Sequence, residues 1–419
     1  MLRHRNLAVF IIFSAIIFLV TYFQAENENS SGPKSPKMRP NYCKDILECL
    51  CHGKWKKKSW VTLQHDEDRV KKDMALREFR GAPVKLSRDD GRCGPENVIK
   101  TSPVFGPAIP AVCEPNSPAP CCNETTGTCG IGEANCTCES CTDFRKVISA
   151  ELFNWVPRNE ACVLKNYTSE EACRVVSERL DSLVLIGDSL MRHFSNSLFT
   201  LFTDDPERGA VQNASEMCHG ERQFVDRGPS SCNRKTIRER ADVEPRTKFC
   251  PGVPYFQYML NLSYCYEFRE GPVELVNKSI LAKKRTAFFI SVGIHDGFNA
   301  KLYQEGYIEP MLSLIGDRDW PKFIWVTTHS PSFTKPVAYR FWQGKEKIRT
   351  YNAAMKKYFK AKGVPVFDVF PMTEGVYSYD GTHYGAGLNM MKSQLLINYI
   401  EHAFKRKTIP RKNSKSNKS

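Results

Sequence analysis

The second half of the chain alternates short apolar runs with longer amphipathic stretches. The apolar runs predict buried strands at residues 182–187, 286–292, 322–328 and 364–370. The amphipathic stretches predict helices at residues 189–203, 301–315, 345–362 and 386–404. Near-continuous apolar strands that alternate with helices are typical of a parallel sheet covered on both faces. The pattern therefore predicts an α/β fold, interrupted by a long insertion at residues 204–284.

An uncharged apolar run occupies residues 7–23, directly after Arg3 and Arg5. The run is at the short end for a membrane-spanning helix and long for the core of a signal peptide. Positive charge before the run favours a cytosolic N-terminus, here residues 1–6. We expect a single transmembrane signal anchor, which makes the protein a type II membrane protein of the Golgi or secretory pathway lumen. The alternative is a cleaved signal peptide and a secreted protein.

All 17 cysteines lie after this run, between Cys43 and Cys265. That density predicts disulfides in an oxidising compartment, and the odd count leaves one thiol free or bonded between chains. Zinc is the competing interpretation for Cys136, Cys138 and Cys141, but a secretory context favours disulfides. Sequons in the same region predict N-glycosylation. The predicted acceptors are Asn29, Asn123, Asn166, Asn213, Asn261 and Asn277.

Composition divides the rest of the chain. Residues 24–42 read as a polar stem, residues 43–87 contain tryptophans and cysteines without a clear assignment, and residues 88–146 are rich in cysteine. The net charge of +14 is concentrated in places such as the basic tail at 405–419, which predicts a solvated tail. The sharper alternative is affinity for anionic glycans or phospholipid headgroups. A luminal topology argues against nucleic acid as a partner.

The cysteine-rich segment contains adjacent Cys121 and Cys122, followed by a Gly-Thr-Cys-Gly step at 127–130. This arrangement resembles the hevein-like chitin-binding module. Modules of that kind hold sugar on aromatic rings around this step, whereas the chain has Thr125, Thr126 and Thr128 there. A disulfide-stapled spacer therefore remains an equal alternative to a carbohydrate-binding role.

Two short motifs carry the candidate chemistry. The strand at 182–187 ends in Gly187, Asp188 and Ser189, which places a serine hydroxyl at the start of a helix. Asp380 and His383 lie three residues apart near the C-terminus, so that one loop could hold both. Together they supply a nucleophile (Ser189), a base (His383) and an acid that orients the base (Asp380). We expect Asp188 to cap the helix.

The blocks at 187–192 and 380–384 resemble the SGNH/GDSL hydrolase superfamily, and more closely its PC-esterase branch of glycan O-acetyltransferases and O-acetylesterases. The resemblance covers about residues 181–404. It implies a three-layer, flavodoxin-like parallel sheet in a catalytic domain at 147–404, an acyl-serine intermediate, and no cofactor or metal.

The superfamily also implies donors for the oxyanion, including a glycine N–H and an asparagine from a Gly-x-Asn-Asp block. Here the block at Gly293 has His295 in the asparagine position, so His295 or Asn299 is expected to take that role. Arg192 and Gly187 are expected beside the oxyanion or substrate. The separate glycine donor is expected in the insertion, with Gly209, Gly220 and Gly228 as candidates.

The acceptor decides the name of the activity. Water as acceptor makes a glycan O-acetylesterase, and a sugar hydroxyl makes an O-acetyltransferase. Two alternatives remain: a non-catalytic carbohydrate-binding membrane protein, and a lipid esterase. The presence of the serine, histidine and aspartate argues against the first.

Overall fold

The computed structural model describes a large part of the chain. The described residues are 46–79, 92–93, 113, 117–123, 126–130, 136, 141–212, 216–226, 232–243, 249–250, 255–260, 266–335 and 337–406. The predicted anchor and stem, and the sequons at Asn29, Asn213 and Asn261, lie outside these residues. Within them, no helix is long and apolar enough to cross a membrane. Contacts place residues 43–419 in a single unit, apart from residues 1–42.

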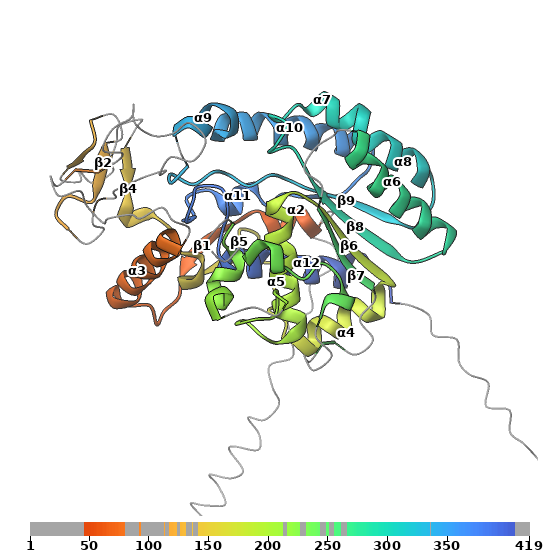
Figure 1. Cartoon of the computed structure of the whole chain (residues 1–419), viewed down its shortest axis with the longest axis horizontal. Coiled ribbons are helices and arrows are strands. Elements are labelled where there is room, and N and C mark those ends of the chain that lie inside the picture. The colour runs from red at the N-terminus through yellow and green to blue at the C-terminus, as the bar shows by residue number, and fades with distance from the viewer. Residues whose placement is uncertain are drawn as a thin grey trace, which may run out of the picture. The chain divides into compact units, whose positions relative to one another are not determined.

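A five-stranded parallel sheet forms the centre of this unit (Figure 1). Its strands are β6 (Ser182–Gly187), β7 (Tyr255–Leu260), β8 (Thr286–Ser291), β9 (Lys322–Val326) and β10 (Val366–Phe367). Their spatial order is β10-β9-β8-β6-β7, and each neighbouring pair is parallel. Read from β7, this is the doubly wound 2-1-3-4-5 order of flavodoxin-like sheets. The predicted α/β fold with a parallel sheet is confirmed.

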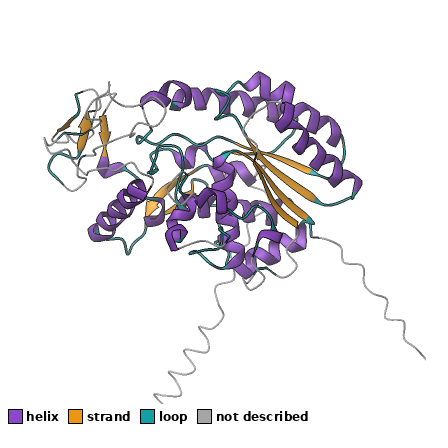
Figure 2. Ribbon diagram, in the orientation of Figure 1, coloured by secondary structure: helices purple, strands orange, loops and turns teal. Residues whose placement is uncertain are grey.

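Helices cover both faces of the sheet (Figure 2). The helices on one face are α4 (Ser169–Arg179), α5 (Ser189–Thr203) and α12 (Ala386–Ala403), and those on the other are α6 (Tyr266–Leu281), α8 (Glu309–Ile315) and α10 (Lys345–Ala361). Side chains of β6 alternate between the two cores: Leu183 and Leu185 join the first, and Val184 and Ile186 the second. Every residue of β6 and β8 is therefore buried.

Some elements differ from the prediction. The edge strand β7 lies inside the predicted insertion, where its alternation of exposed Tyr255 with buried Phe256 and Tyr258 hides it from a search for continuous apolar runs. The helix predicted at 301–315 is divided into α7 (Ala300–Tyr303), a π-helical turn (Gln304–Ile308) and α8. The strand predicted at 364–370 shrinks to the two residues of β10, because Phe370 begins α11 (Phe370–Thr373).

Two elements of the segment that the sequence left unassigned belong to the same core. Helix α2 (Ile46–Cys51) buries Leu47 and Leu50 in the cluster that contains α12, and β1 (Gly53–Lys57) pairs antiparallel with β5 (Phe153–Pro157). A disulfide between Cys49 and Cys162 joins these parts covalently. The long helix α3 (Leu63–Phe79) follows β1. The N-terminal segment therefore supports the fold directly.

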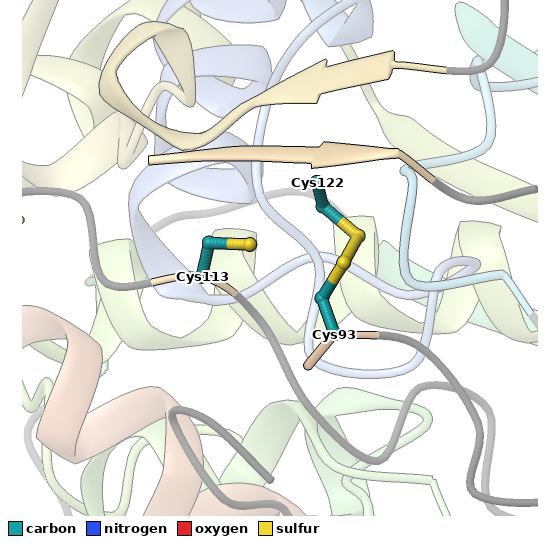
Figure 3. Close-up of side chains that lie close together, drawn as sticks. All are labelled: Cys93, Cys113 and Cys122. Atoms are coloured by element: carbon teal, nitrogen blue, oxygen red, sulfur yellow. A yellow bond between two sulfur atoms is a disulfide. The ribbon is translucent and has the colours of Figure 1, made fainter. Parts of the chain in front are cut away.

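Disulfides hold the cysteine-rich segment around three short strands: β2 (Cys121–Asn123), β3 (Thr128–Gly130) and β4 (Cys141–Asp143). The sulfur atoms of Cys93, Cys113 and Cys122 lie within 4.8 Å of one another. Cys93 and Cys122 are bonded to each other (Figure 3), and Cys113 is bonded to Cys129. Sulfur atoms in disulfides are not the thiolates that zinc requires.

The structure bears on the zinc alternative for this segment, and it leaves the hevein-like assignment untested. Cys136, which a zinc site would need, is bonded to Cys121, so the disulfide interpretation holds at that residue. Thr126 and Thr128 are exposed, and their hydroxyls lie 2.6 Å apart. The hevein-like assignment stays a prediction.

Two ionisable side chains are buried against each other, Lys392 of α12 and His329 of the loop after β9. The amine of Lys392 lies 3.1 Å from Nε2 of His329 and 4.8 Å from the centroid of the Phe194 ring. Burial holds the pKa of Lys392 well below its usual value. Burial, together with the nearby Lys392 amine, does the same to the pKa of His329. Both side chains therefore resist protonation in the folded state.

We expect the protein to lose stability as the pH falls below about 6.5, where an unfolded histidine takes up a proton that folded His329 refuses. One such group removes up to about 1.4 kcal/mol of unfolding free energy per pH unit. His329→Gln keeps an acceptor for Lys392 and should flatten the dependence of Tm on pH between about pH 7.5 and 5.5, one unit either side of that value. An unchanged slope in the variant would contradict this account.

Candidate active site

The turn between β6 and α5 presents the candidate nucleophile. Asp188 is the N-cap of α5, as expected, and its carboxylate accepts the backbone N–H of Leu190 at 2.9 Å. The hydroxyl of Tyr258 donates to the carbonyls of Gly187 and Asp188 at 3.1 and 3.0 Å. A Cβ atom on Gly187 would lie 2.1 Å from the carbonyl oxygen of Ser291. Only glycine therefore permits this close approach of the turn to β8.

Three polar side chains meet at this turn. Nε2 of His383 lies 2.6 Å from Oγ of Ser189, and Nδ1 of His383 lies 2.8 Å from Oδ2 of Asp380. The other carboxylate oxygen of Asp380 accepts the backbone N–H groups of Thr382 and His383 at 2.8 and 2.7 Å. The structure thus brings together the three residues predicted to act as nucleophile, base and orienting acid.

This geometry has a direct chemical consequence. With Nδ1–H donated to Asp380, the lone pair on Nε2 of His383 faces the Ser189 hydroxyl and can accept its proton. Ser189 and Asp380 are 8% and 4% exposed, so the charges that develop here are only weakly screened by water. The arrangement can perform nucleophilic acyl transfer through a covalent ester on Ser189.

The structure adds a fourth residue, Asp226, that the sequence analysis missed. Its Oδ2 lies 3.2 Å from Nε2 of His383, and its Oδ1 lies 3.0 Å from Nε2 of His193 and accepts from the Arg192 guanidinium. Its backbone N–H donates to the hydroxyl of Tyr379 at 2.7 Å. Asp226 lies in the insertion, where no motif marks it. The available signal was the adjacent basic pair on α5, which needs a carboxylate partner when buried.

Burial fixes the protonation of the residues around Ser189. Burial, aided by nearby His383 and the Arg192 guanidinium, holds the pKa of His193 well below its usual value. His193 is therefore neutral and donates Nε2–H to Asp226. Burial raises the pKa of Asp188, and the charges of His295, His383 and Arg192 oppose that shift.

The residues predicted to contact the oxyanion differ in the hydrogen bonds that they already make. As the first residue of α5, Ser189 has a backbone N–H with no acceptor within the helix, so this group can serve as a donor. Gly293 follows β8, and its carbonyl accepts the N–H of Phe298 at 3.1 Å. His295 is exposed on the same loop. Asn299 is the N-cap of α7, and its side-chain oxygen accepts the N–H of Leu302 at 3.2 Å.

The glycine donor expected in the insertion is not found among the described candidates. The N–H of Gly209 donates to the Asp205 carbonyl at 2.9 Å, and that of Gly220 donates to the Glu207 carbonyl at 2.8 Å. Neither group can also serve an oxyanion in this arrangement, so the prediction fails for both. Gly228 lies outside the described residues.

Comparison with known proteins gives weak similarities. No protein-family model matches the chain, and no curated protein matches it. Among solved structures, it is similar to a GDSL-like lipase from Bacteroides thetaiotaomicron, with 14% identity, 54% of this chain and 89% of that chain covered, and a TM-score of 0.34.

Two further solved structures are similar to the chain. One is the C-terminal catalytic domain of peptidoglycan O-acetyltransferase A from Streptococcus pneumoniae, with 11% identity, 55% and 99% of the two chains covered, and a TM-score of 0.30. The other is a carbohydrate acetylesterase from Sinorhizobium meliloti, with 13% identity, 53% and 99% covered, and a TM-score of 0.29. At this level of similarity, the assignment of chemistry to the chain rests on the geometry of the site.

Proposed function

We propose that the protein is a serine acyl-transfer enzyme of the SGNH type, an O-acetylesterase or O-acetyltransferase that acts on glycans or glycoconjugates. One observation carries the proposal: the continuous hydrogen-bonded series from Ser189 Oγ through the His383 imidazole to the Asp380 carboxylate. Each group has the partner that nucleophilic catalysis requires of it.

The reaction follows from these contacts. Ser189 Oγ attacks the ester carbonyl carbon while its proton passes to Nε2 of His383, and Asp380 stabilises the resulting imidazolium. The N–H of Ser189 at the N-terminus of α5 faces the developing oxyanion. The oxyanion collapses, the bond to the leaving alkoxide breaks, and that alkoxide takes the proton from Nε2. Water or a sugar hydroxyl then attacks acyl-Ser189 with His383 again as base, which releases the acyl group and restores Ser189.

The choice of a glycan substrate rests on sequence and compartment. The blocks at 187–192 and 380–384 resemble the PC-esterase branch, whose members modify glycans. The disulfides are compatible with an extracellular or luminal location. Asn166 and Asn277 are exposed, as glycosylation would require. We place the enzyme in the secretory pathway lumen, anchored through residues 7–23.

The nucleophile is tested with a fluorophosphonate probe and with acetylated glycans on the purified protein. We expect Ser189→Ala and His383→Ala each to lower labelling and acetate release by about 10⁴-fold or more, and the double variant to be little worse, because the residues act as a unit. Asp380→Asn keeps Ser189 and His383 but should also lower turnover, because loss of the carboxylate alters the orientation and charge of the imidazole.

Ser195→Ala is the matched control, since Ser195 is buried on the same helix and its hydroxyl makes no hydrogen bond in the described part of the chain. This variant should retain wild-type labelling. Wild-type turnover in Ser189→Ala would refute the covalent mechanism. Glycan binding without any labelling or acetate release by the wild type would instead favour the non-catalytic alternative.

A further inference from the structure

The short helix α9 (Val337–Gln343) exposes two adjacent aromatic rings. Phe341 is 76% exposed and Trp342 is 56% exposed. The two ring centroids lie 5.0 Å apart at an interplanar angle of 86°. Large rings are costly to leave in water, and adjacent exposed rings mark a binding surface. In Figure 1, α9 leads into α10.

Hydrogen bonds connect this helix to the loops of the active site. The side-chain amide of Gln343, the residue after Trp342, donates to the carbonyl of Ile294 at 3.1 Å. The amine of Lys335 donates both to Gln343 and, at 2.5 Å, to the hydroxyl of Thr382, the residue before His383. The amine of Lys347 lies 5.1 Å from the Trp342 ring centroid. The same amine is the atom nearest to a Cβ atom placed on Gly297, at 3.9 Å.

We infer that Phe341 and Trp342 form a sugar-binding platform on which a pyranose ring of the glycan substrate stacks. This inference rests on the proposed function and names the surface that holds the substrate outside the triad. An indole or phenyl face offers apolar area to the C–H face of a sugar, and polar groups beside it bind the hydroxyls. Lys347 supplies such a donor. In the cysteine-rich segment, exposed Thr126 and Thr128 occupy the places where a hevein-like module has rings, whereas α9 has rings beside the catalytic loops.

The platform is tested with Trp342→Ala and Phe341→Ala. The matched control is Trp60→Ala, because Trp60 is also 56% exposed and its ring lies against His65 and Lys58 of the N-terminal segment. We expect each platform variant to raise KM for an acetylated oligosaccharide by about tenfold, the scale of an aromatic contact. The rise in KM for p-nitrophenyl acetate, which has no sugar ring, should be smaller. Trp60→Ala should match the wild type on both substrates.

Calorimetric titration of the oligosaccharide into Ser189→Ala, with and without Trp342→Ala, measures binding without turnover. We expect about tenfold weaker binding in the double variant. Equal affinity of the two proteins, or no binding by Ser189→Ala, would overturn the platform. An active platform variant with a wild-type KM would overturn it as well. Failure of the wild type to react with a fluorophosphonate probe would instead count against the proposed function.

The contacts of Asp226 carry a second inference. Arg192 and His193 both donate to Oδ1, which leaves Oδ2 facing Nε2 of His383 at 3.2 Å. The Asp226 side chain is 14% exposed, so its charge is only partly screened by water. His383 therefore has a carboxylate beside each ring nitrogen, Asp380 at Nδ1 and Asp226 at Nε2.

We infer that Asp226 is a second acid of the site, which stabilises the imidazolium after Ser189 gives up its proton and holds Arg192 in place. This role also rests on the proposed function. The carboxylate attracts the positive imidazolium and makes no comparable gain with the neutral ring, so it lowers the energy of the charged transition state.

The test is the pH dependence of fluorophosphonate labelling of Ser189 in Asp226→Asn. Loss of the negative charge disfavours protonated His383, so the acidic limb of the rate profile should move to lower pH by about one unit or more. The plateau rate should fall by about 10- to 100-fold. Asp226→Glu keeps the charge and should keep the limb close to its wild-type position.

A purely structural role for Asp226 predicts a lower yield or Tm without movement of the limb. If Asp226→Asn labels Ser189 and its acidic limb stays at the wild-type pH, this inference is wrong. If Asp226→Asn does not fold, the limb of Asp226→Glu decides, because a limb shifted to lower pH despite the retained charge would contradict it. Absence of labelling in the wild type would count against the proposed function.

Discussion

The contact between the imidazole of His383 and the hydroxyl of Ser189 is the interaction on which the rest of the site depends. The two residues are 194 positions apart in the chain, yet Nε2 and Oγ approach to 2.6 Å. Such an approach requires the turn after β6 and the loop before α12 to be fixed independently. Gly187 lets the first lie against β8, and the N–H groups of Thr382 and His383 fix the second on Asp380. Neither motif creates the site alone.

Residues distant in sequence bind the start of α12, directly after the loop that carries His383. Glu221 accepts the N–H of Ala386 at 2.9 Å and Glu151 accepts that of Gly387 at 3.0 Å, so two carboxylates lie at the positive end of α12. Arg69 of α3 lies 3.3 Å from Glu221 and 3.5 Å from Glu151. The N-terminal segment thus places a guanidinium beside the two carboxylates that accept the first N–H groups of α12.

The sequence predicted what local rules determine. The bounds of β6 and α5 match the prediction because a continuous apolar run, a glycine turn and a capping aspartate all act within a few residues. Strand β7 was not predicted, because an edge strand buries only alternate side chains and so has no continuous apolar run. Asp226 was not predicted because its role comes from side chains on other elements, and nothing in the sequence distinguishes it from other carboxylates of the insertion. The exposed rings of α9 gain meaning only when the structure places Gln343 on the loop after β8.

The most direct test of the account is to capture the covalent intermediate. The purified protein is mixed with an acetyl ester, quenched in acid within the first turnover, digested and mapped by mass spectrometry. The account predicts an acetyl group on Ser189, which is absent in Ser189→Ala and strongly reduced in His383→Ala. Acetate release without any acetyl on Ser189, or with the group on another residue, would contradict it.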